Sequence, residues 1–349
     1  MLVPEAEAWV RRARPGEEDV VLIPCVYPPP QPPCGTAEGL EEAAGLRRTW
    51  LRNGLASDRL RVMLALAPAP SEPFIDYPGV GPIPTEALAR GGHIPAGLVE
   101  YAPGDYAAEP VEAQGAWVIH CVWVIPPYAG RGIARRLVRE VLRDVGADPG
   151  CPDLRDGPTP AMAVIAYDRE TWWGYFDYMP AAFFARLGFE AIDRDGPRLL
   201  MYHAAAPDRL PSHQGSTAGV RAPARTHGAG SITKGPPRLI KARPELSPAE
   251  LSLVEGGQPD TVDVRVLLHS RCPAAVLVRH TLEAGLGRYP GVRLECIDTR
   301  DRAAMRWHGV ANGVYVDGRM LLHKLPSPPE IATLLRRAGA MRATPADGM

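Results

Sequence analysis

The most constraining feature of this sequence is an apolar run at 117–125, WVIHCVWVI, which is followed by a glycine-rich turn. Because nearly every residue of the run is apolar, it is typical of a strand buried on both faces of a sheet. Apolar positions at helical spacing over 133–145 predict a helix directly after the turn. A buried strand that leads through a tight turn into a helix indicates an α/β fold.

The turn itself, YAGRGIA at 128–134, has the chemistry of a phosphate-binding site. Gly130 and Gly132 allow the backbone to turn tightly and to approach a ligand closely. The free N–H groups at the start of the next helix favour an anion, and Arg131 adds a positive charge. No GxxxxGK[ST] pattern occurs, and Arg135 stands where the third glycine of a GxGxxG fingerprint would be. The turn therefore predicts a pyrophosphate site of a different class.

Further patterns extend the α/β organisation over 19–203. The predicted strands are 19–27, 61–67, 96–101, 161–167, 189–192 and 198–203, and the predicted helices are 36–53 and 181–187. The stretch at 68–95 is rich in Pro and Gly, so we expect a long loop there.

Two motifs in this region resemble the GNAT N-acyltransferase superfamily. In that family a strand ending V-x-P runs into [Q/R]-x-x-G-x-[G/A] and a helix. The matching positions are Val124, Pro126, Gly132 and Ala134. Ala129 stands at the Gln/Arg position, so its N–H remains available but a side-chain contact to the cofactor is lost. The second motif, FFARLGFE at 183–190, is similar to the family's F-Y-x-x-x-G-F-x. The order of elements is similar to the family fold, a central mixed sheet with flanking helices.

The resemblance implies that acetyl-CoA binds in the splay between the strands at 117–125 and 161–167. Backbone groups near Val122 and Val124 would orient the pantetheine arm and the thioester. The pyrophosphate would lie against the turn, at Ala129, Gly130, Arg131, Gly132, Ile133 and Ala134. A small-molecule amine would then attack the thioester directly, without an acyl-enzyme.

Direct attack needs a base that deprotonates an ammonium group. Glu100 ends a strand next to the expected cofactor strand, and Asp168 follows the strand on its other side. His120 lies within the cofactor strand, on the same alternating face as Val122 and Val124. These three residues are the candidate bases, although a lone His in an apolar strand is more often a core residue.

A leaving thiolate often takes its proton from an acid. In many relatives the acid is the Tyr of the F-Y motif, and Phe184 stands at that position here. Tyr178 is a candidate substitute, and the alternative is that Tyr178 only packs.

The stretch at 207–237, rich in Pro, Gly and Ser, predicts a flexible linker between a first domain at 1–206 and a second at 238–349. The second domain's order of strand, helix, strand, helix, hairpin and helix resembles the thioredoxin fold. Cys272 lies where the first redox cysteine would be, but Ala275 replaces the second, so no CxxC disulfide can form. A binding or dimerisation module and a lone reactive thiol both remain open. The segments at 97–103 and 120–124 resemble YoaP-like proteins, which pair a GNAT domain with a small C-terminal domain.

The net charge of −1 provides no global field that would attract nucleic acid or an anionic membrane. The total hides a split, because 1–205 holds 19 Lys+Arg and 27 Asp+Glu, whereas 206–349 holds 20 and 13. This split permits attraction between the two halves. We find no long apolar run, no secretory signal and no metal-ligand pattern among the six cysteines, and therefore expect a cytoplasmic protein without a metal site.

Together these features predict an N-acetyltransferase that transfers an acetyl group from acetyl-CoA to a small-molecule amine. Two alternatives are a thiol-dependent redox protein that uses Cys272 and a non-catalytic acyl-CoA-binding protein.

Overall fold

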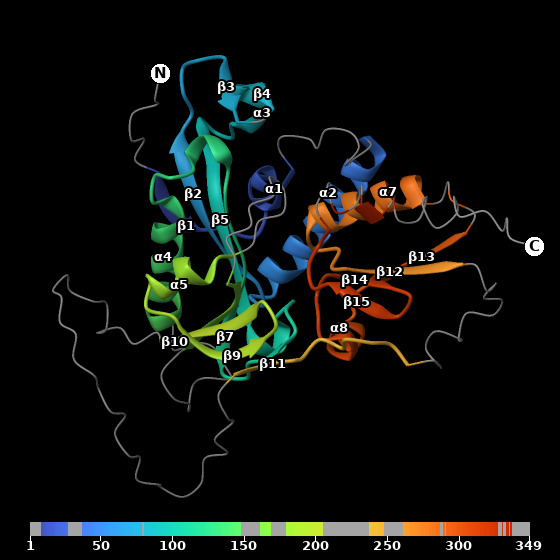
Figure 1. Ribbon diagram of the computed structural model, residues 1–349. Helices are drawn as coiled ribbons and strands as arrows, with labels where there is room; N and C mark the ends of the chain where they lie inside the picture. Colours follow the sequence, from blue (N-terminus) through green and yellow to red (C-terminus); the bar gives the residue numbers. More distant parts are fainter. Residues whose placement is uncertain are drawn as a thin grey trace, which may run out of the picture.

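The computed structural model describes two units and, between them in the sequence, a segment at 237–247 (Figure 1). The described residues are 8–26, 37–78, 80–147, 161–168, 179–204, 237–247, 261–286, 289, 291–326, 330, 333, 334 and 336. We call 8–204 the N-terminal unit and 261–336 the C-terminal unit. Within the described residues, no helix has the length and apolar character needed to cross a membrane.

A seven-stranded sheet forms the centre of the N-terminal unit. In sheet order its strands are β1 (Trp9–Arg12), β2 (Arg61–Pro68), β5 (His93–Pro103), β7 (Ala116–Val124), β8 (Ala161–Tyr167), β10 (Arg198–Ala204) and β9 (Glu190–Asp195). Only β7 and β8 run parallel, and the other neighbours are antiparallel. The predicted central mixed sheet is confirmed, and the strands predicted from 61 onwards lie close to their expected bounds.

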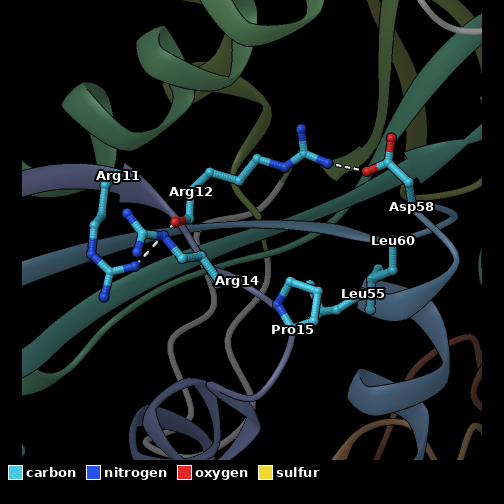
Figure 2. Close-up of a pocket in the computed structure, with 8 residues that line it drawn as sticks. Arg11, Arg12, Arg14, Pro15, Leu55, Asp58 and Leu60 are labelled. Carbon is cyan, nitrogen blue, oxygen red and sulfur yellow. Dashed lines mark hydrogen bonds and ion pairs between the residues drawn. The ribbon is translucent and has the colours of Figure 1, made fainter.

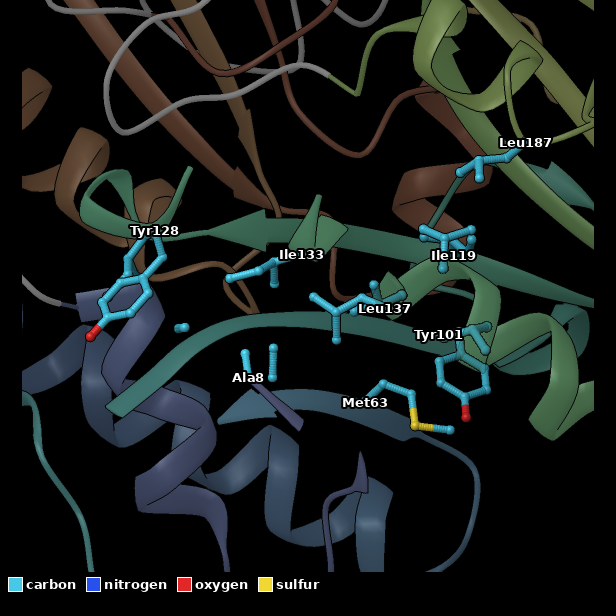
Figure 3. Close-up of a cluster of buried hydrophobic side chains, with 14 of the residues drawn as sticks. Ala8, Met63, Tyr101, Ile119, Tyr128, Ile133, Leu137 and Leu187 are labelled. Atoms are coloured by element: carbon cyan, nitrogen blue, oxygen red, sulfur yellow. The ribbon is translucent and has the colours of Figure 1, made fainter. Parts of the chain in front are cut away.

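Helices cover both faces of this sheet. The helices α1 (Glu18–Val26) and α2 (Ala37–Ala56) pack on one face, where Leu51 meets Leu64 and Leu98. The helices α4 (Ile133–Ala147) and α5 (Ala181–Ala185) pack on the other face, where Leu137 lies in one apolar cluster with Ile119 (Figure 3). Charged side chains are rare in such cores, so the few on the α1/α2 face indicate a site.

Two predicted elements of the N-terminal unit were wrong. The run predicted as a strand at 19–27 is helix α1, whose residues Val21 and Ile23 pack in two different core clusters. A short apolar run does not distinguish a buried helix from a strand, and the acidic pair Glu18 and Asp19 favours a helix start through the helix dipole. The edge strand is β1 instead.

The stretch predicted as a long loop at 68–95 contains regular structure. The strands β3 (Phe74–Tyr77) and β4 (Gly81–Pro84) form a hairpin, and the short helix α3 (Thr85–Leu88) follows. Ile75 and Ile83 face each other across the hairpin and are buried in the core, which explains why this Pro-rich segment is ordered.

The C-terminal unit is a four-stranded sheet with helices on either side. Its strands, in sheet order, are β13 (Val292–Asp298), β12 (Val262–Leu268), β14 (Gly313–Val316) and β15 (Arg319–Leu322). The β12–β13 pair is parallel and the other two pairs are antiparallel. Helix α7 (Pro273–Leu286) packs against β12, and helix α8 (Arg302–His308) lies across the sheet from α7 (Figure 1).

The two units are docked through helices α2 and α7, which lie side by side (Figure 1). Ala43 of α2 shares an apolar cluster with Val276 and Leu277 of α7. The connecting segment also touches both units, because β11 (Arg238–Leu239) pairs with β6 (Val111–Glu112), while Leu246 N–H donates to the Gly318 carbonyl. The predicted linker at 207–237 lies outside the described residues except for its last position.

Candidate functional site

Strands β7 and β8 separate part-way along their length. Their pairing begins with Ala116 opposite Ala161 and ends with Ile119 opposite Val164. Strand β7 continues to Val124, so its residues from His120 onward have no β8 partner on that edge. The two strands predicted to flank the cofactor are thus parallel neighbours that splay apart. Backbone N–H and C=O groups on such an edge are available to a ligand.

The glycine turn follows the open end of β7. Gly130 and Gly132 both have φ of 75°, a conformation that glycine adopts without strain. A Cβ atom built at either glycine would meet no atom within 4 Å, so the turn lies against open space. Helix α4 begins at Ile133, which directs its first N–H groups into this space.

Ala129 differs from its predicted role. Its N–H, which we expected to be free for a ligand, donates to the Pro126 carbonyl at 3.1 Å inside the short helix η2 (Pro126–Tyr128). Arg131 folds back, because its Nη2 donates to the Pro127 carbonyl at 3.1 Å and its guanidinium lies 5.3 Å from the Tyr128 ring centre.

A bulge in β7 corrects the predicted facing of His120. Glu100 pairs with Cys121 and Tyr101 pairs with Ile119, so His120 is an extra residue between them. After the bulge, Val122 and Val124 pack in the α4-side cluster, whereas His120 points to the α1/α2 face beside Glu100. A bulge redirects side chains in this way, and bulges are frequent next to active sites.

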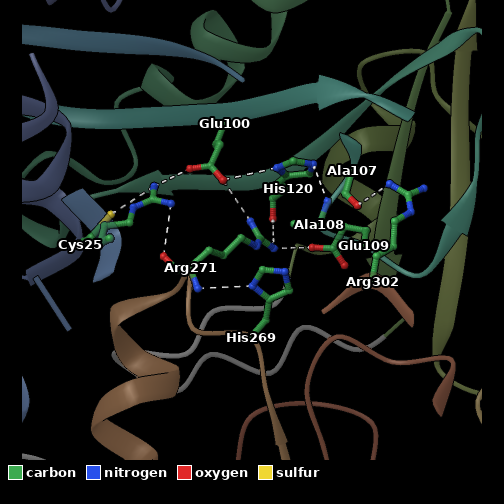
Figure 4. A network of polar contacts seen from close by, with 10 residues as sticks. Cys25, Glu100, Ala107, Ala108, Glu109, His120, His269, Arg271 and Arg302 are labelled. Atoms are coloured by element: carbon green, nitrogen blue, oxygen red, sulfur yellow. Dashed lines mark hydrogen bonds and ion pairs between the residues drawn. The ribbon is translucent and has the colours of Figure 1, made fainter. Parts of the chain in front are cut away.

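A buried polar cluster fills the α1/α2 face beside the splay (Figure 4). Its members are Arg47, Glu100, Glu109, His120 and Arg271. Glu100 is fully buried, and its two oxygens contact Arg47 Nη2 at 2.5 Å, Arg271 Nη1 at 3.2 Å and His120 Nδ1 at 3.3 Å. Burial opposes ionisation, but Arg47, His120 and Arg271 outweigh it and hold the pKa of Glu100 well below its usual range.

Both ring nitrogens of His120 are in use. Nε2 accepts from the Ala108 N–H at 3.2 Å, which assigns the proton of the neutral ring to Nδ1, facing Glu100. Burial lowers the pKa of His120 to about 4, against the opposing effect of Glu100. His120 is therefore neutral at pH 7, with its lone pair already bonded to the backbone.

Glu109 is a member that sequence reasoning missed. Its Oε1 accepts from Arg271 Nη2 at 2.5 Å. Burial raises the pKa of Glu109 to about 7, although Arg271 and Arg198 oppose the shift. Arg271 Nη2 also lies 3.5 Å from the His120 carbonyl oxygen, so the Glu109 carboxylate lies beside the bulge at which β7 leaves β8. A carboxyl group with a pKa near 7 is suited to exchange protons at neutral pH.

Comparison with known protein families gives a match within the N-terminal unit. Residues 63–155 match the model of the acetyltransferase (GNAT) family. This part of the chain is a GNAT acetyltransferase domain. The match spans β2 to α4, and so includes the bulge, the start of the splay and the glycine turn.

No curated protein matches the chain. Solved structures with similarity include a GNAT family N-acetyltransferase (YhbS) from Escherichia coli in complex with CoA, at 15% identity and a TM-score of 0.33, covering 60% of this chain and 87% of that one. The PaiA N-acetyltransferase from Thermoplasma acidophilum in complex with coenzyme A has 12% identity and a TM-score of 0.32, covering 57% and 99%. A GNAT family acetyltransferase from Brucella melitensis in complex with acetyl-CoA has 17% identity and a TM-score of 0.29, covering 62% and 97%.

Of the other residues considered for catalysis, Asp168 and Phe184 contact residues outside the polar cluster. Asp168 follows β8, and its carboxylate pairs with Arg194 of β9 in an exposed ion pair. Phe184 is fully buried in the core beside Phe189 and supplies no hydroxyl group. Tyr178 lies outside the described residues, so its acid role stays a prediction.

The thiols near the polar cluster are free. Burial raises the pKa of Cys25 to about 11, although Arg47, whose Nη2 lies 3.9 Å from its sulfur, opposes this shift. Burial also raises the pKa of Cys121. Thiols with raised pKa values stay protonated and are poor nucleophiles. Among the described residues, no group of His, Cys, Asp and Glu has the arrangement needed to hold a metal ion.

A surface cavity of about 540 Å³ lies away from this site, between β1 and the end of α2 (Figure 2). Arg11 and Arg12 line it, but Arg11 pairs with Glu17 and Arg12 pairs with Asp58. Two of the three arginines that line it are therefore paired within the chain.

Proposed function

We propose that this protein is an acetyl-CoA-dependent N-acetyltransferase that acts on a small-molecule amine. The observation that carries the proposal is the splay of β7 and β8, which opens at Ile119 and leads to the glycine turn before α4. One continuous path therefore offers backbone groups for an extended arm and an N-terminal helix end for a diphosphate.

In this proposal the pantetheine arm pairs with the free edge of β7 at Val122 and Val124. The pyrophosphate lies against Gly130, Arg131, Gly132, Ile133 and Ala134, where both glycines face open space. Ala129 contributes no N–H, because that group is bonded within η2. The thioester then lies near the bulge at His120.

We propose Glu109 as the base. It takes a proton from the ammonium group of the acceptor, and the free amine then forms a bond to the thioester carbon. The C–S bond breaks, and the proton that the attacking nitrogen loses passes to the coenzyme A thiolate, so the products are the amide and the coenzyme A thiol. Glu100 is a weak base, because its charge is stabilised by Arg47 and Arg271. His120 orients Glu100 through Nδ1. Asp168 is less favoured as the base, because its carboxylate pairs with Arg194 at the surface.

We propose that the C-terminal unit is a thioredoxin-like domain of the YoaP type that covers the acceptor side. The sheet order β13-β12-β14-β15, with one parallel pair and an antiparallel hairpin, supports this proposal. A redox role for Cys272 is less favoured, because Ala275 stands at the second position and Cys272 packs against the unit's own core. The domain boundaries at 206 and 238 are part of this proposal. Strand β11, which begins at 238, pairs with β6 of the N-terminal unit, so the first residues after the linker contact that unit.

Calorimetric titration with acetyl-CoA tests the cofactor assignment. Gly132→Val forces a β-branched residue into φ of 75° and adds bulk at the turn, so we expect affinity to fall by about 10- to 100-fold. Gly196→Val is the matched control, since Gly196 has φ of 56° in open space at the β9–β10 turn. Equal affinity in a folded Gly132→Val protein would overturn the assignment. An amine library scored by released coenzyme A thiol then identifies the acceptor.

A further inference from the structure

The C-terminal unit inserts one side chain into the acceptor side of the GNAT domain. Arg271 lies in the loop between β12 and α7, and its guanidinium reaches the polar cluster (Figure 4). Nη1 is 3.2 Å from Glu100 Oε1, and Nη2 is 2.5 Å from Glu109 Oε1 and 3.5 Å from the His120 carbonyl oxygen. Only 9% of the side chain is exposed.

The groups that receive Arg271 are all acceptors, and all belong to the GNAT domain. Two carboxylates and one carbonyl converge on a single cation, an arrangement that selects a positively charged group with several N–H donors. The carbonyl comes from the bulge residue His120, where β7 leaves β8. The cation therefore lies beside the splay in which we propose the thioester.

Arg271 does not use its full bonding capacity there. Its buried Nε has no hydrogen-bond partner among the described residues. A buried donor without a partner weakens the docked state relative to a fully bonded one. A ligand whose donors match these acceptors can therefore compete for the position.

Glu100 does not depend on Arg271 alone. Arg47 Nη2 contacts Glu100 Oε2 at 2.5 Å, so Glu100 keeps one counter-ion when Arg271 leaves. Arg47 Nη1 also donates to the Arg271 backbone carbonyl at 3.3 Å, which anchors the loop rather than the guanidinium. The side chain can therefore swing away while its loop stays attached.

We propose that Glu100, Glu109 and the His120 carbonyl form a site for a small organic cation, with an ammonium or guanidinium group, and that Arg271 occupies this site until the ligand displaces it. The identification of this cation as the acceptor rests on the proposed transferase function. The presence of the site itself does not.

Binding of methylguanidinium, which copies the head group of arginine, tests the proposal on the full chain without acetyl-CoA. We expect calorimetry to show that Arg271→Ala binds this probe at least about tenfold more tightly than the unmodified protein, the worth of one charge-assisted hydrogen bond. Adding Glu109→Gln to Arg271→Ala should remove the gain.

Arg279→Ala is the matched control. Arg279 also lies on the C-terminal unit, and its Nη2 contacts Glu42 of α2 at 2.5 Å, so its loss loosens docking without emptying the site. We expect this variant to bind methylguanidinium no better than the unmodified protein. An equal gain in Arg279→Ala would mean that loosened docking, not a vacated cation site, accounts for binding, and would overturn the proposal.

Arg271→Lys gives a second route if Arg271→Ala fails to fold. Lysine keeps the charge but cannot bridge two carboxylates with a planar fork, so we expect a smaller gain in affinity for the probe. No gain in any folded Arg271 variant would overturn the proposal. Failure of the transferase function would appear separately, as absent acetyl-CoA binding in the unmodified protein.

Discussion

The glycine turn follows the end of β7 and the buried polar cluster lies beside the bulge in β7. The two regions offer a ligand different chemical groups. The turn is exposed at Ala129, Gly130 and Gly132 and offers backbone groups. The cluster is buried and offers charged side chains, with Glu100 fully enclosed. The turn comes from one short stretch of sequence, whereas the cluster draws on α2, β5, β7 and two loops, one of them from the other unit.

This difference determines how each region responds to change. A backbone site depends on conformation, so most side-chain changes around it are tolerated. Buried charges depend on one another, because removing one partner leaves another without compensation in a medium of low polarity. The cluster should therefore be sensitive to single-atom substitutions that the turn would tolerate.

The largest effect is expected at Glu109, on the acceptor side. Glu109→Gln removes a base of pKa about 7 but keeps its size, so we expect kcat/KM for acetyl transfer to fall by about 10²–10⁴. Acetyl-CoA affinity should stay the same, as measured by calorimetry. Near-normal turnover in this variant would contradict the assignment of proton transfer to the polar cluster and of cofactor binding to the turn.

The pH profile sharpens the same point. The base must be deprotonated, so kcat/KM should rise with pH through about 7 and then level off. The neighbours that affect this titration are Arg271, Arg198, Glu100 and Tyr167. Glu109→Gln should abolish the rise, and a rise that persists in Glu109→Gln would assign it to another group.

The next effect is on stability rather than rate. Glu100→Gln leaves Arg47 and Arg271 facing a neutral group, so we expect the free energy of unfolding to fall by about 3–5 kcal/mol. Denaturant unfolding followed by circular dichroism measures this loss. A loss of less than about 1 kcal/mol would mean that the cluster behaves like a surface ion pair.

The smallest effect is expected at Asp168, whose pair with Arg194 is exposed. Asp168→Asn should change the free energy of unfolding by less than about 1 kcal/mol, because solvent screens the pair. It should also leave kcat/KM within about twofold, since a base contributes far more than that. A loss of turnover comparable to that of Glu109→Gln would instead assign the base to Asp168.

The sequence predicted the turn well because all of its determinants are local. Gly130, Gly132 and the apolar face of α4 lie within one short stretch, and each carries its own conformational signal. The strand predicted at 19–27 was wrong for the opposite reason, since tertiary packing decides more than the local pattern whether a short apolar run is a helix. The N–H of Ala129 was assigned to the cofactor because the short helix η2 has no clear signal.

The polar cluster could be predicted only in part. Glu100 and His120 were recognised as polar residues in apolar strands, but their partners lie far away in the chain. Glu109 stands in an irregular loop with no pattern around it, and Arg271 looked like a neighbour of Cys272. The one global signal was the charge split between 1–205 and 206–349, which agrees with the Arg271 contacts to Glu100 and Glu109.

The segment that joins the units helps Arg271 to compete with any free ligand. Ile240 N–H donates to the Pro110 carbonyl, next to Glu109, while Arg243 N–H donates to the His308 carbonyl of the C-terminal unit. This double attachment keeps the arginine tethered, and short tethers correspond to effective concentrations in the millimolar range, roughly 10⁻³ M. A diffusing cation therefore competes with the tethered guanidinium of Arg271. It displaces this group only when it is abundant or binds with more than one group.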